Sequence, residues 1–156
     1  MKVVLSSDHR GYAAKENIKS YLTEAGHTVL DAGCHDGASC DYSDMGLAGA
    51  RDVARGEAER GIFLCGTGIG MSIAANKVKG IRAALCHDEL TAELSRRHND
   101  ANVLCLPADL IGEHLINRVI DVWLETEYEG GRHQRRIDKI TAFENNQQAA
   151  HPNAPQ

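Results

Sequence analysis

Short apolar runs alternate along the chain with segments whose apolar residues recur every three or four positions. The runs have the length and composition of strands buried on both faces. They occupy residues 3–5, 27–30, 62–65, 81–86 and 103–106. Between them, spacings such as Ile18 with Leu22 and Leu115 with Val119 predict amphipathic helices. Strands that alternate with helices predict βαβ units, so we expect an α/β fold with a parallel sheet covered by helices on both faces.

The pattern contains no linker and no internal repeat, and a chain of 156 residues suits one domain. A charged segment from Arg132 to about Asn145 follows Gly130-Gly131 and predicts a last helix. The residues after it are polar and include two prolines. We therefore expect one domain over residues 1–144 and a disordered tail over residues 145–156.

Charge and hydropathy exclude two classes of partner. The 17 Lys and Arg residues against 22 Asp and Glu residues give a net charge of −5, whereas a nucleic-acid-binding protein usually has a basic face. No stretch is apolar over the ~20 residues that a membrane span needs, and the N-terminal segment turns polar at Ser6, too early for a signal peptide. We expect neither nucleic acid nor a membrane as a partner.

The five cysteines form no CxxC pair, and an odd number without a secretory signal predicts reduced thiols in the cytoplasm. Cys34-His35 with Cys40 matches no standard zinc spacing, so we expect no metal site there. Most of these cysteines are expected to be small buried side chains.

The clearest local signal for chemistry is the segment from Cys65 to Met71, which directly follows an apolar run. Gly66, Gly68 and Gly70 allow backbone N–H groups to converge on an anion at the start of a helix, although a tight turn without a ligand explains them equally well. Met71 breaks the dinucleotide-binding pattern, which needs a glycine there. A thiol at Cys65 could act as a base or nucleophile, or be a buried, inert side chain.

Two further polar groups are candidates. Asp8-His9 ends the first apolar run, where the pair suits proton transfer or ligand binding, while Asp8 could instead cap a helix. His98-Asn99 ends a helical segment and follows two arginines. His98 and Asn99 could face a ligand, or the arginines and His98 could simply complement the helix dipole.

Arg132 and Arg136 are spaced by four residues, so a helix starting there would place them on one face. Cations at a helix N-terminus are unfavourable by roughly 0.3–1 kcal/mol, and a phosphate held between them would offset this cost. In an acidic chain, this pair is the place where we expect a phosphate.

Six stretches of the chain, in this order over residues 1–144, together resemble the type B ribose-5-phosphate isomerase family, which includes galactose-6-phosphate isomerase subunits. They are Ser7-Asp8-His9 with Gly11, Asp41-Tyr42-Ser43-Asp44, Cys65-Gly66-Thr67-Gly68-Ile69-Gly70-Met71-Ser72-Ile73-Ala74-Ala75-Asn76-Lys77, Gly80-Ile81-Arg82-Ala83-Ala84, His98-Asn99-Asp100-Ala101-Asn102-Val103 and Glu129-Gly130-Gly131-Arg132-His133. The resemblance implies a Rossmann-like three-layer sandwich with a five-stranded parallel sheet and a C-terminal helix. It also implies a homodimer or tetramer with active sites shared between chains.

The activity implied by the resemblance is the interconversion of ribose 5-phosphate and ribulose 5-phosphate without a metal or organic cofactor. It assigns Cys65 as the base that moves a proton between C1 and C2, in the branch of the family that uses a cysteine. Thr67 would assist exchange between the two oxygens, and His98, helped by Asp8, would open the furanose ring. The remaining site residues are implied to bind the enediolate, the phosphate or the sugar; they are Gly66, Gly68, Ile69, Gly70, His9, Arg132, Arg136, Tyr42 and Asn99.

The chain departs from the family pattern at two positions. Asp109 stands where many members have an arginine that could contact phosphate, and Arg10 stands where a small or apolar residue is common. We expect Arg10 to be able to supply a replacement cation. The departure leaves open another sugar phosphate as substrate (galactose 6-phosphate, allose 6-phosphate or a four-carbon sugar phosphate) and, less favoured, a non-catalytic ligand-binding module.

Overall fold

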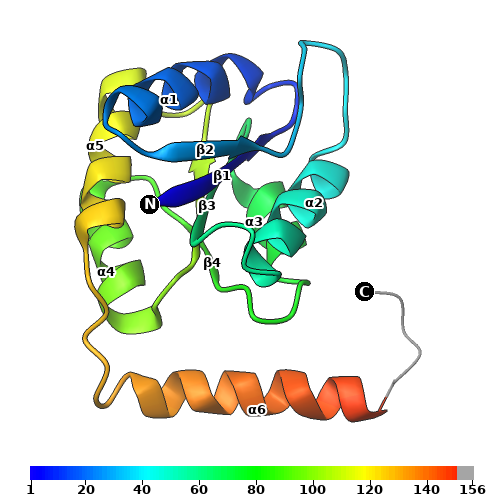
Figure 1. The fold of residues 1–156 in the computed structure, drawn as a ribbon, viewed down its shortest axis with the longest axis vertical. Coiled ribbons are helices and arrows are strands. Elements are labelled where there is room, and N and C mark those ends of the chain that lie inside the picture. Colours follow the sequence, from blue (N-terminus) through cyan, green and yellow to red (C-terminus); the bar gives the residue numbers. More distant parts are fainter. Residues whose placement is uncertain (151–156) are drawn as a thin grey trace.

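The computed structural model describes residues 1–150 and contains five parallel strands between two layers of helices (Figure 1). The sheet order is β2-β1-β3-β5-β4. The strands are β1 (Lys2–Ser7), β2 (Thr28–Asp31), β3 (Arg60–Cys65), β4 (Ala83–Leu85) and β5 (Val103–Pro107). The helices are α1 (Tyr12–Glu24), α2 (Tyr42–Ala54), α3 (Ile69–Ala75), α4 (Glu89–Asn99), α5 (Glu113–Glu125) and α6 (Gln134–Ala150). The expected α/β sandwich with a five-stranded parallel sheet is confirmed.

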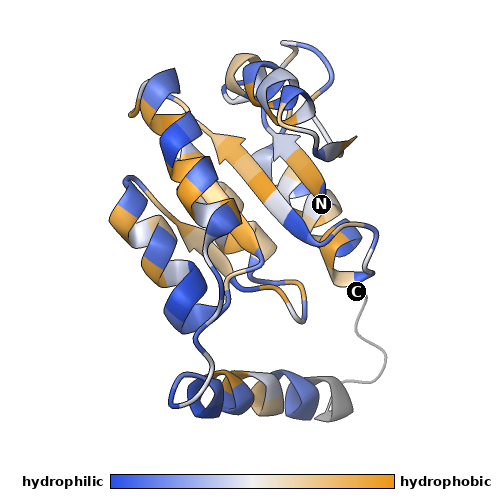
Figure 2. Ribbon diagram, turned by 60° about the vertical axis from the view of Figure 1, so that its left-hand side comes forward, coloured by the Kyte–Doolittle hydropathy of each residue, from blue (hydrophilic) through white to orange (hydrophobic). Residues whose placement is uncertain are grey.

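Each face of the sheet has its own core, because successive side chains of a strand point to opposite faces. Val3 and Leu5 pack with α1, α4 and α5, where Trp123 is fully buried. Val4, between them, belongs to the other core with Phe63 and with residues of α2 and α3. Apolar residues accordingly run along the strands, whereas apolar and polar residues alternate along the helices, as Figure 2 shows.

All five strands run in the same direction. We call the side of the sheet where the strands end the carboxyl edge, and the side where they begin the amino edge. The strand order reverses between β1 and β3, which are paired directly. In open parallel sheets, ligands bind outside the carboxyl ends of the strands at such a reversal. We therefore expect a ligand site at the residues that follow Ser7 and Leu64, which are partners in the β1–β3 register.

The C-terminal helix differs from expectation at both ends. It starts at Gln134 rather than Arg132, because Gly130 and Gly131 have φ of 64° and 56° and the turn continues through His133. It runs to Ala150, so the tail expected from residue 145 is helical as far as the structure describes it. Glutamine and alanine are strong helix formers, so the helix continues although the segment is polar. Residues 151–156 of the expected tail lie outside the described part.

Helix α6 lies to one side of the two layers, as Figure 1 shows. Its Ile140 and Phe143 side chains are exposed although both are large and apolar. No helix within residues 1–150 is both long enough and apolar enough to cross a membrane.

Candidate active site

Asp8 directly follows β1 and Cys65 ends β3, the two neighbouring strands at the reversal point of the sheet. Asp8 donates its backbone N–H to the Leu64 carbonyl at 3.2 Å, which continues the β1–β3 ladder by one residue. Both side chains are buried, with 6% and 5% of their surface exposed. A carboxylate and a thiol are thus held together at the carboxyl edge, as the sequence predicts.

The Asp8 carboxylate is fixed by the turn that leads into α1. Its Oδ1 accepts the backbone N–H groups of Arg10 at 2.9 Å and Gly11 at 3.0 Å. Helix α1 begins beyond this turn, with Gly11 as its N-cap, so Asp8 braces the turn rather than capping the helix itself. Gly11 is needed there because a Cβ would lie 2.8 Å from the Leu64 carbonyl oxygen.

His9 contacts the loop between β2 and α2. Its Nδ1 lies 3.1 Å from the Cys40 carbonyl oxygen and 3.4 Å from the Cys40 amide nitrogen, and its side chain is exposed. In the same loop the Cys34 and Cys40 sulfurs are 2.8 Å apart as free thiols. His35 turns instead toward Asp31, 3.8 Å away, so it does not join the two thiols around a common point.

The glycine-rich turn surrounds the Cys65 sulfur with backbone. Gly68 has φ of 73°, a left-handed conformation that glycine adopts without strain, and it caps α3. Its N–H donates to Cys65 Sγ at 3.1 Å. A donor aimed at sulfur stabilises a thiolate, which is the form that acts as a base or nucleophile. The Thr67 hydroxyl lies beside this turn and accepts the Ile69 N–H at 3.3 Å.

The ring of Tyr42 packs on Gly70, the last glycine of the turn. A Cβ on Gly70 would lie 2.6 Å from Tyr42 Cδ2, so this ring rests directly on the glycine backbone. Tyr42 begins α2 and is 47% exposed. The structure thus brings Tyr42 to the glycine-rich turn, although 27 residues, including those of β3, lie between Tyr42 and Gly70 in the sequence.

An ion pair covers the first glycine of the turn. Arg10 Nε lies 2.6 Å from Asp109 Oδ2, and a Cβ on Gly66 would lie 2.5 Å from that carboxylate oxygen. Asp109 is anchored there because its N–H donates to the Gly66 carbonyl at 3.0 Å. Bonding to Asp109 raises the pKa of Arg10 further above its usual value. The two residues that depart from the family pattern are therefore partners of one another.

The other predicted site residues lie at the amino edge of the sheet. His98 and Asn99 end α4, and the Asn99 carbonyl accepts Arg82 Nε–H at 2.9 Å just before β4 begins. The backbone of Glu129 donates to the Arg97 carbonyl at 3.1 Å, which ties the turn that carries Arg132 to the same edge. Strands of five to six residues are roughly 17–20 Å long, so these groups are far from Cys65 within one chain.

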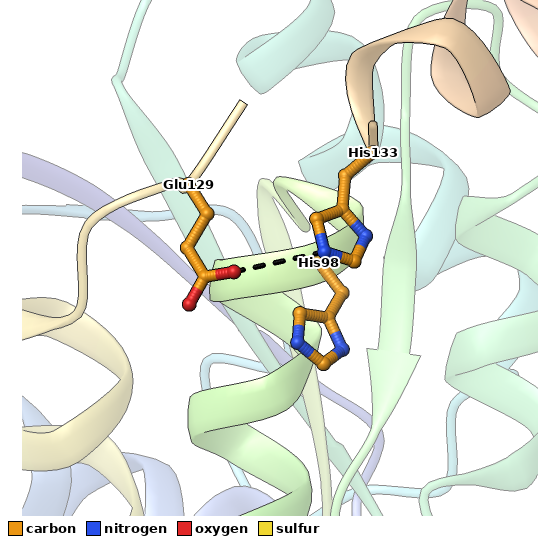
Figure 3. A group of neighbouring side chains, drawn as sticks. All are labelled: His98, Glu129 and His133. Atoms are coloured by element: carbon orange, nitrogen blue, oxygen red, sulfur yellow. Dashed lines mark ion pairs between the residues drawn. The ribbon is translucent and has the colours of Figure 1, made fainter. Parts of the chain in front are cut away.

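His98 meets a residue that the sequence did not single out. The imidazole rings of His98 and His133 are stacked, with centroids 4.3 Å apart and planes 6° from parallel (Figure 3). Glu129 Oε2 lies 3.6 Å from His133 Nε2. His133 could have been noticed as the aromatic residue between Arg132 and Arg136, but only the fold shows that α4 ends against it.

Within the described residues, His98, Glu129 and His133 form the one group with the composition of a metal site. Their geometry opposes this use. A metal ion lies in the plane of each imidazole that binds it, and the planes of two stacked rings run side by side without meeting at a common point. Arg97 also holds Glu129, with Nε 2.6 Å from Oε1. The arrangement suits an acid–base or anion site better than a cation site.

Fold and site together define a class: an α/β protein with a thiol and a glycine-rich turn at the strand reversal, where small ligands bind. Residues 3–140 match the model of the ribose/galactose isomerase family. The chain belongs to this family.

Individual relatives cover nearly the whole chain. Ribose-5-phosphate isomerase B of Escherichia coli is 45% identical over 92% of this chain and 96% of its own. D-erythrulose-4-phosphate isomerase of Pectobacterium atrosepticum is 40% identical over 92% of this chain and 95% of its own.

Solved structures agree with the fold. Ribose-5-phosphate isomerase B of Clostridium thermocellum superposes with a TM-score of 0.92 at 48% identity, covering 94% of this chain and 99% of that one. The enzyme of Mycoplasma genitalium, solved with bound ribulose 5-phosphate, gives a TM-score of 0.88 at 41% identity over 92% and 96% of the two chains.

Proposed function

We propose that the protein interconverts ribose 5-phosphate and ribulose 5-phosphate by proton transfer through an enediolate. The observation that carries the proposal is the buried Cys65 thiol, which receives the Gly68 N–H at the strand reversal of a ribose/galactose isomerase fold. Relatives named as isomerases of this sugar phosphate support the substrate.

The chemistry assigned to the carboxyl edge balances without a cofactor. Cys65, as a thiolate, removes the proton from C2 of the open-chain aldose, and the electrons form the enediolate. Backbone N–H groups of residues 66–70 stabilise the negative oxygen as an oxyanion hole does. Thr67 passes the hydroxyl proton from O2 to O1, and the Cys65 thiol returns its proton to C1 to give the ketose.

A complete site requires two chains. Asp8, His9, Tyr42, Cys65 and Thr67 lie at the carboxyl edge, whereas His98, Asn99, Arg132 and Arg136 lie at the amino edge. Ring opening by His98 and proton transfer by Cys65 act on the same sugar, so the two groups must come from different copies. We assign a homodimer, alone or paired into a tetramer, in which each amino edge completes the partner's carboxyl edge.

The phosphate is assigned to Arg132 and Arg136 of the partner chain and to His9. Arg10 adds a cation at the carboxyl edge, because its contact with Asp109 is made through Nε and its side chain is 60% exposed. Guanidinium groups held in this way bind phosphate through paired hydrogen bonds. The five cysteines are free thiols, which supports a cytoplasmic location.

One observation favours a second substrate. Asp109 places a carboxylate beside Arg10 at the mouth of the site, which reduces the positive charge available to a phosphate and changes the space for the sugar. A relative that acts on erythrulose 4-phosphate is 40% identical to this chain. A shorter sugar phosphate is therefore the rival to ribose 5-phosphate.

A panel of sugar phosphates tests the proposal. Ribose 5-phosphate, allose 6-phosphate, galactose 6-phosphate and erythrulose 4-phosphate would be compared by kcat/KM, with and without a chelator. We expect the highest value for ribose 5-phosphate and no effect of chelation. A higher kcat/KM for another sugar phosphate would overturn the assigned substrate, and no turnover of any of them would support a non-catalytic binding module.

A further inference from the structure

The His133 ring is 6% exposed and lies among three residues that the proposed reaction uses. His98 stacks on its face at 4.3 Å. Arg132 Nε lies 3.3 Å from its Nε2, and Arg136 Nη1 lies 3.4 Å from its Nδ1. A single buried ring thus contacts the ring-opening histidine and both phosphate-binding arginines.

The surroundings of this ring favour its neutral form. Guanidinium groups only donate hydrogen bonds, so a ring nitrogen that faces Arg132 or Arg136 has to accept. A neutral imidazole has one accepting nitrogen, whereas an imidazolium has none. Burial lowers the pKa of His133, and the positive charges of His98, Arg132 and Arg136 lower it further, although Glu129 opposes them.

Glu129 limits where the ring can move. Its carboxylate faces His133 Nε2 at 3.6 Å and is held from the other side by Arg97. Arg97 in turn contacts Glu93 at 2.6 Å on its own helix. The chain of contacts fixes the turn at residues 129–133 against the last turn of α4, so His98 and His133 are held face to face (Figure 3).

We propose that His133 is a positioning residue for the reaction: its neutral ring supports the imidazole of His98 and spaces Arg132 and Arg136 around the phosphate. This inference rests on the proposed function. The ring has two separate tasks, because its face meets His98 while its edge nitrogens meet the arginines. Two substitutions can therefore separate them.

His133→Phe keeps an aromatic face for His98 and removes both edge nitrogens. We expect KM for ribose 5-phosphate and the Kd for inorganic phosphate, measured by calorimetry, to rise about tenfold, while kcat stays within about twofold. His133→Asn keeps a polar acceptor near Arg136 and removes the aromatic face. Here we expect kcat to fall about tenfold and phosphate affinity to change little.

A direct readout of the stack comes from the ring protons of His98 in NMR spectra, assigned with the His98→Asn variant. An aromatic face at this distance shields them, so we expect their resonances to move downfield in His133→Asn and to remain close to wild type in His133→Phe. His27→Asn is the matched control, because His27 also lies at the amino edge and its Nδ1 lies 3.5 Å from the amino nitrogen of Met1 rather than near His98 or the arginines.

The two variants also distinguish positioning from mere stability. If both lower kcat and raise KM in the same proportion, together with an equal drop in the unfolding midpoint, the ring is only structural and the inference fails. It fails too if neither variant moves kcat, KM or the His98 resonances. Absence of isomerase activity in the wild-type protein would refute the proposed function instead, and the NMR and phosphate measurements would still decide whether His133 positions its neighbours.

Discussion

At the scale of single residues, the proposed reaction depends most on the thiol of Cys65. Four other cysteines are present, yet only Cys65 lies at the carboxyl edge with a backbone N–H on its sulfur among the described contacts. Cys105, on the neighbouring strand, is fully buried, and burial raises the pKa of its thiol well above the ordinary value. Burial thus disfavours the thiolate of Cys105, whereas the Cys65 sulfur has the Gly68 N–H beside it, as the proposed base requires.

Cys65→Ala is expected to lower kcat for ribose 5-phosphate by about 10²–10⁴-fold, the range for loss of a general base. Binding of inorganic phosphate, measured by calorimetry, should survive because the cations remain. Cys105→Ala is the matched control and should retain kcat. Turnover close to that of the wild type in Cys65→Ala would refute the role of Cys65 as the base.

Arg10→Ala tests the cation at the mouth of the site. If the guanidinium contacts the phosphate, KM should rise about tenfold with little change in kcat, as expected for a lost charge-assisted hydrogen bond. Arg55→Ala removes an exposed arginine that pairs with Asp52 at 2.7 Å, and it should leave KM unchanged. Equal KM values for Arg10→Ala and the wild type would confine Arg10 to a surface ion pair.

At the scale of elements, the glycine-rich turn joins β3 to α3 with no room for a side chain at Gly68. Gly68→Ala would place a Cβ at φ of 73° and 2.5 Å from Leu85 Cδ1. We expect a loss of about 1–3 kcal/mol in the free energy of unfolding, measured with urea, and a fall in kcat. Gly37→Ala, with open space around the new Cβ, is the control and should change neither. Equal stability of the two variants would show that the turn tolerates a side chain.

Helices α1 and α5 are joined by Tyr21, whose hydroxyl donates to Asp121 at 2.7 Å. This hydrogen bond, with burial and the negative charges of Asp121 and Glu125, raises the pKa of Tyr21 to about 12. An unfolded tyrosine ionises near pH 10, so the stabilisation is complete below about pH 10 and is lost as the pH rises through the folded value.

Tyr21→Phe should therefore destabilise the protein by about 1 kcal/mol at pH 8, with a smaller difference from wild type at alkaline pH. The measurement is the urea midpoint of both proteins from pH 8 to pH 11. A difference that does not shrink with rising pH would contradict the assigned role of the hydrogen bond.

Local sequence patterns predicted the elements that bury an apolar face. They did not predict the bounds of elements whose residues are mostly polar and bury little. The runs at 3–5 and 62–65 predict β1 and β3 because both faces of these strands are buried. Helix α6 is mostly polar, so its extension to Ala150 depends on propensity alone. Gly130 and Gly131 end the preceding segment with positive φ, which delays the helix past Arg132.

For the candidate site, too, one part could be predicted from the sequence and another could not. The strand ends place Asp8, Cys65 and the glycine-rich turn together, and this could be predicted from the topology rule for parallel sheets. The stack of His98 on His133 could not, since it depends on the angle at which the turn after α5 returns to α4. The pairing of Arg10 with Asp109 joins residues 99 positions apart and likewise needs the fold.

At the scale of the whole molecule, the proposed reaction uses both edges of one sheet. Cys65 and His98 lie at opposite edges, and no bend in a packed parallel sheet would bring them onto one sugar. Symmetric pairing solves this problem, because a two-fold axis produces two identical composite sites from two identical chains. The exposed Ile140 and Phe143 of α6 offer apolar surface for such contact.

Mixing two inactive variants tests this claim most directly. Cys65→Ala lacks the base and His98→Asn lacks the ring-opening acid, so each homodimer should be inactive on ribose 5-phosphate. After unfolding and refolding together, half of the dimers are hybrids, and each hybrid has one site with both groups intact. We predict that the mixture recovers about a quarter of the wild-type activity. If it stays as inactive as its components while wild type survives the same treatment, the site does not combine two chains.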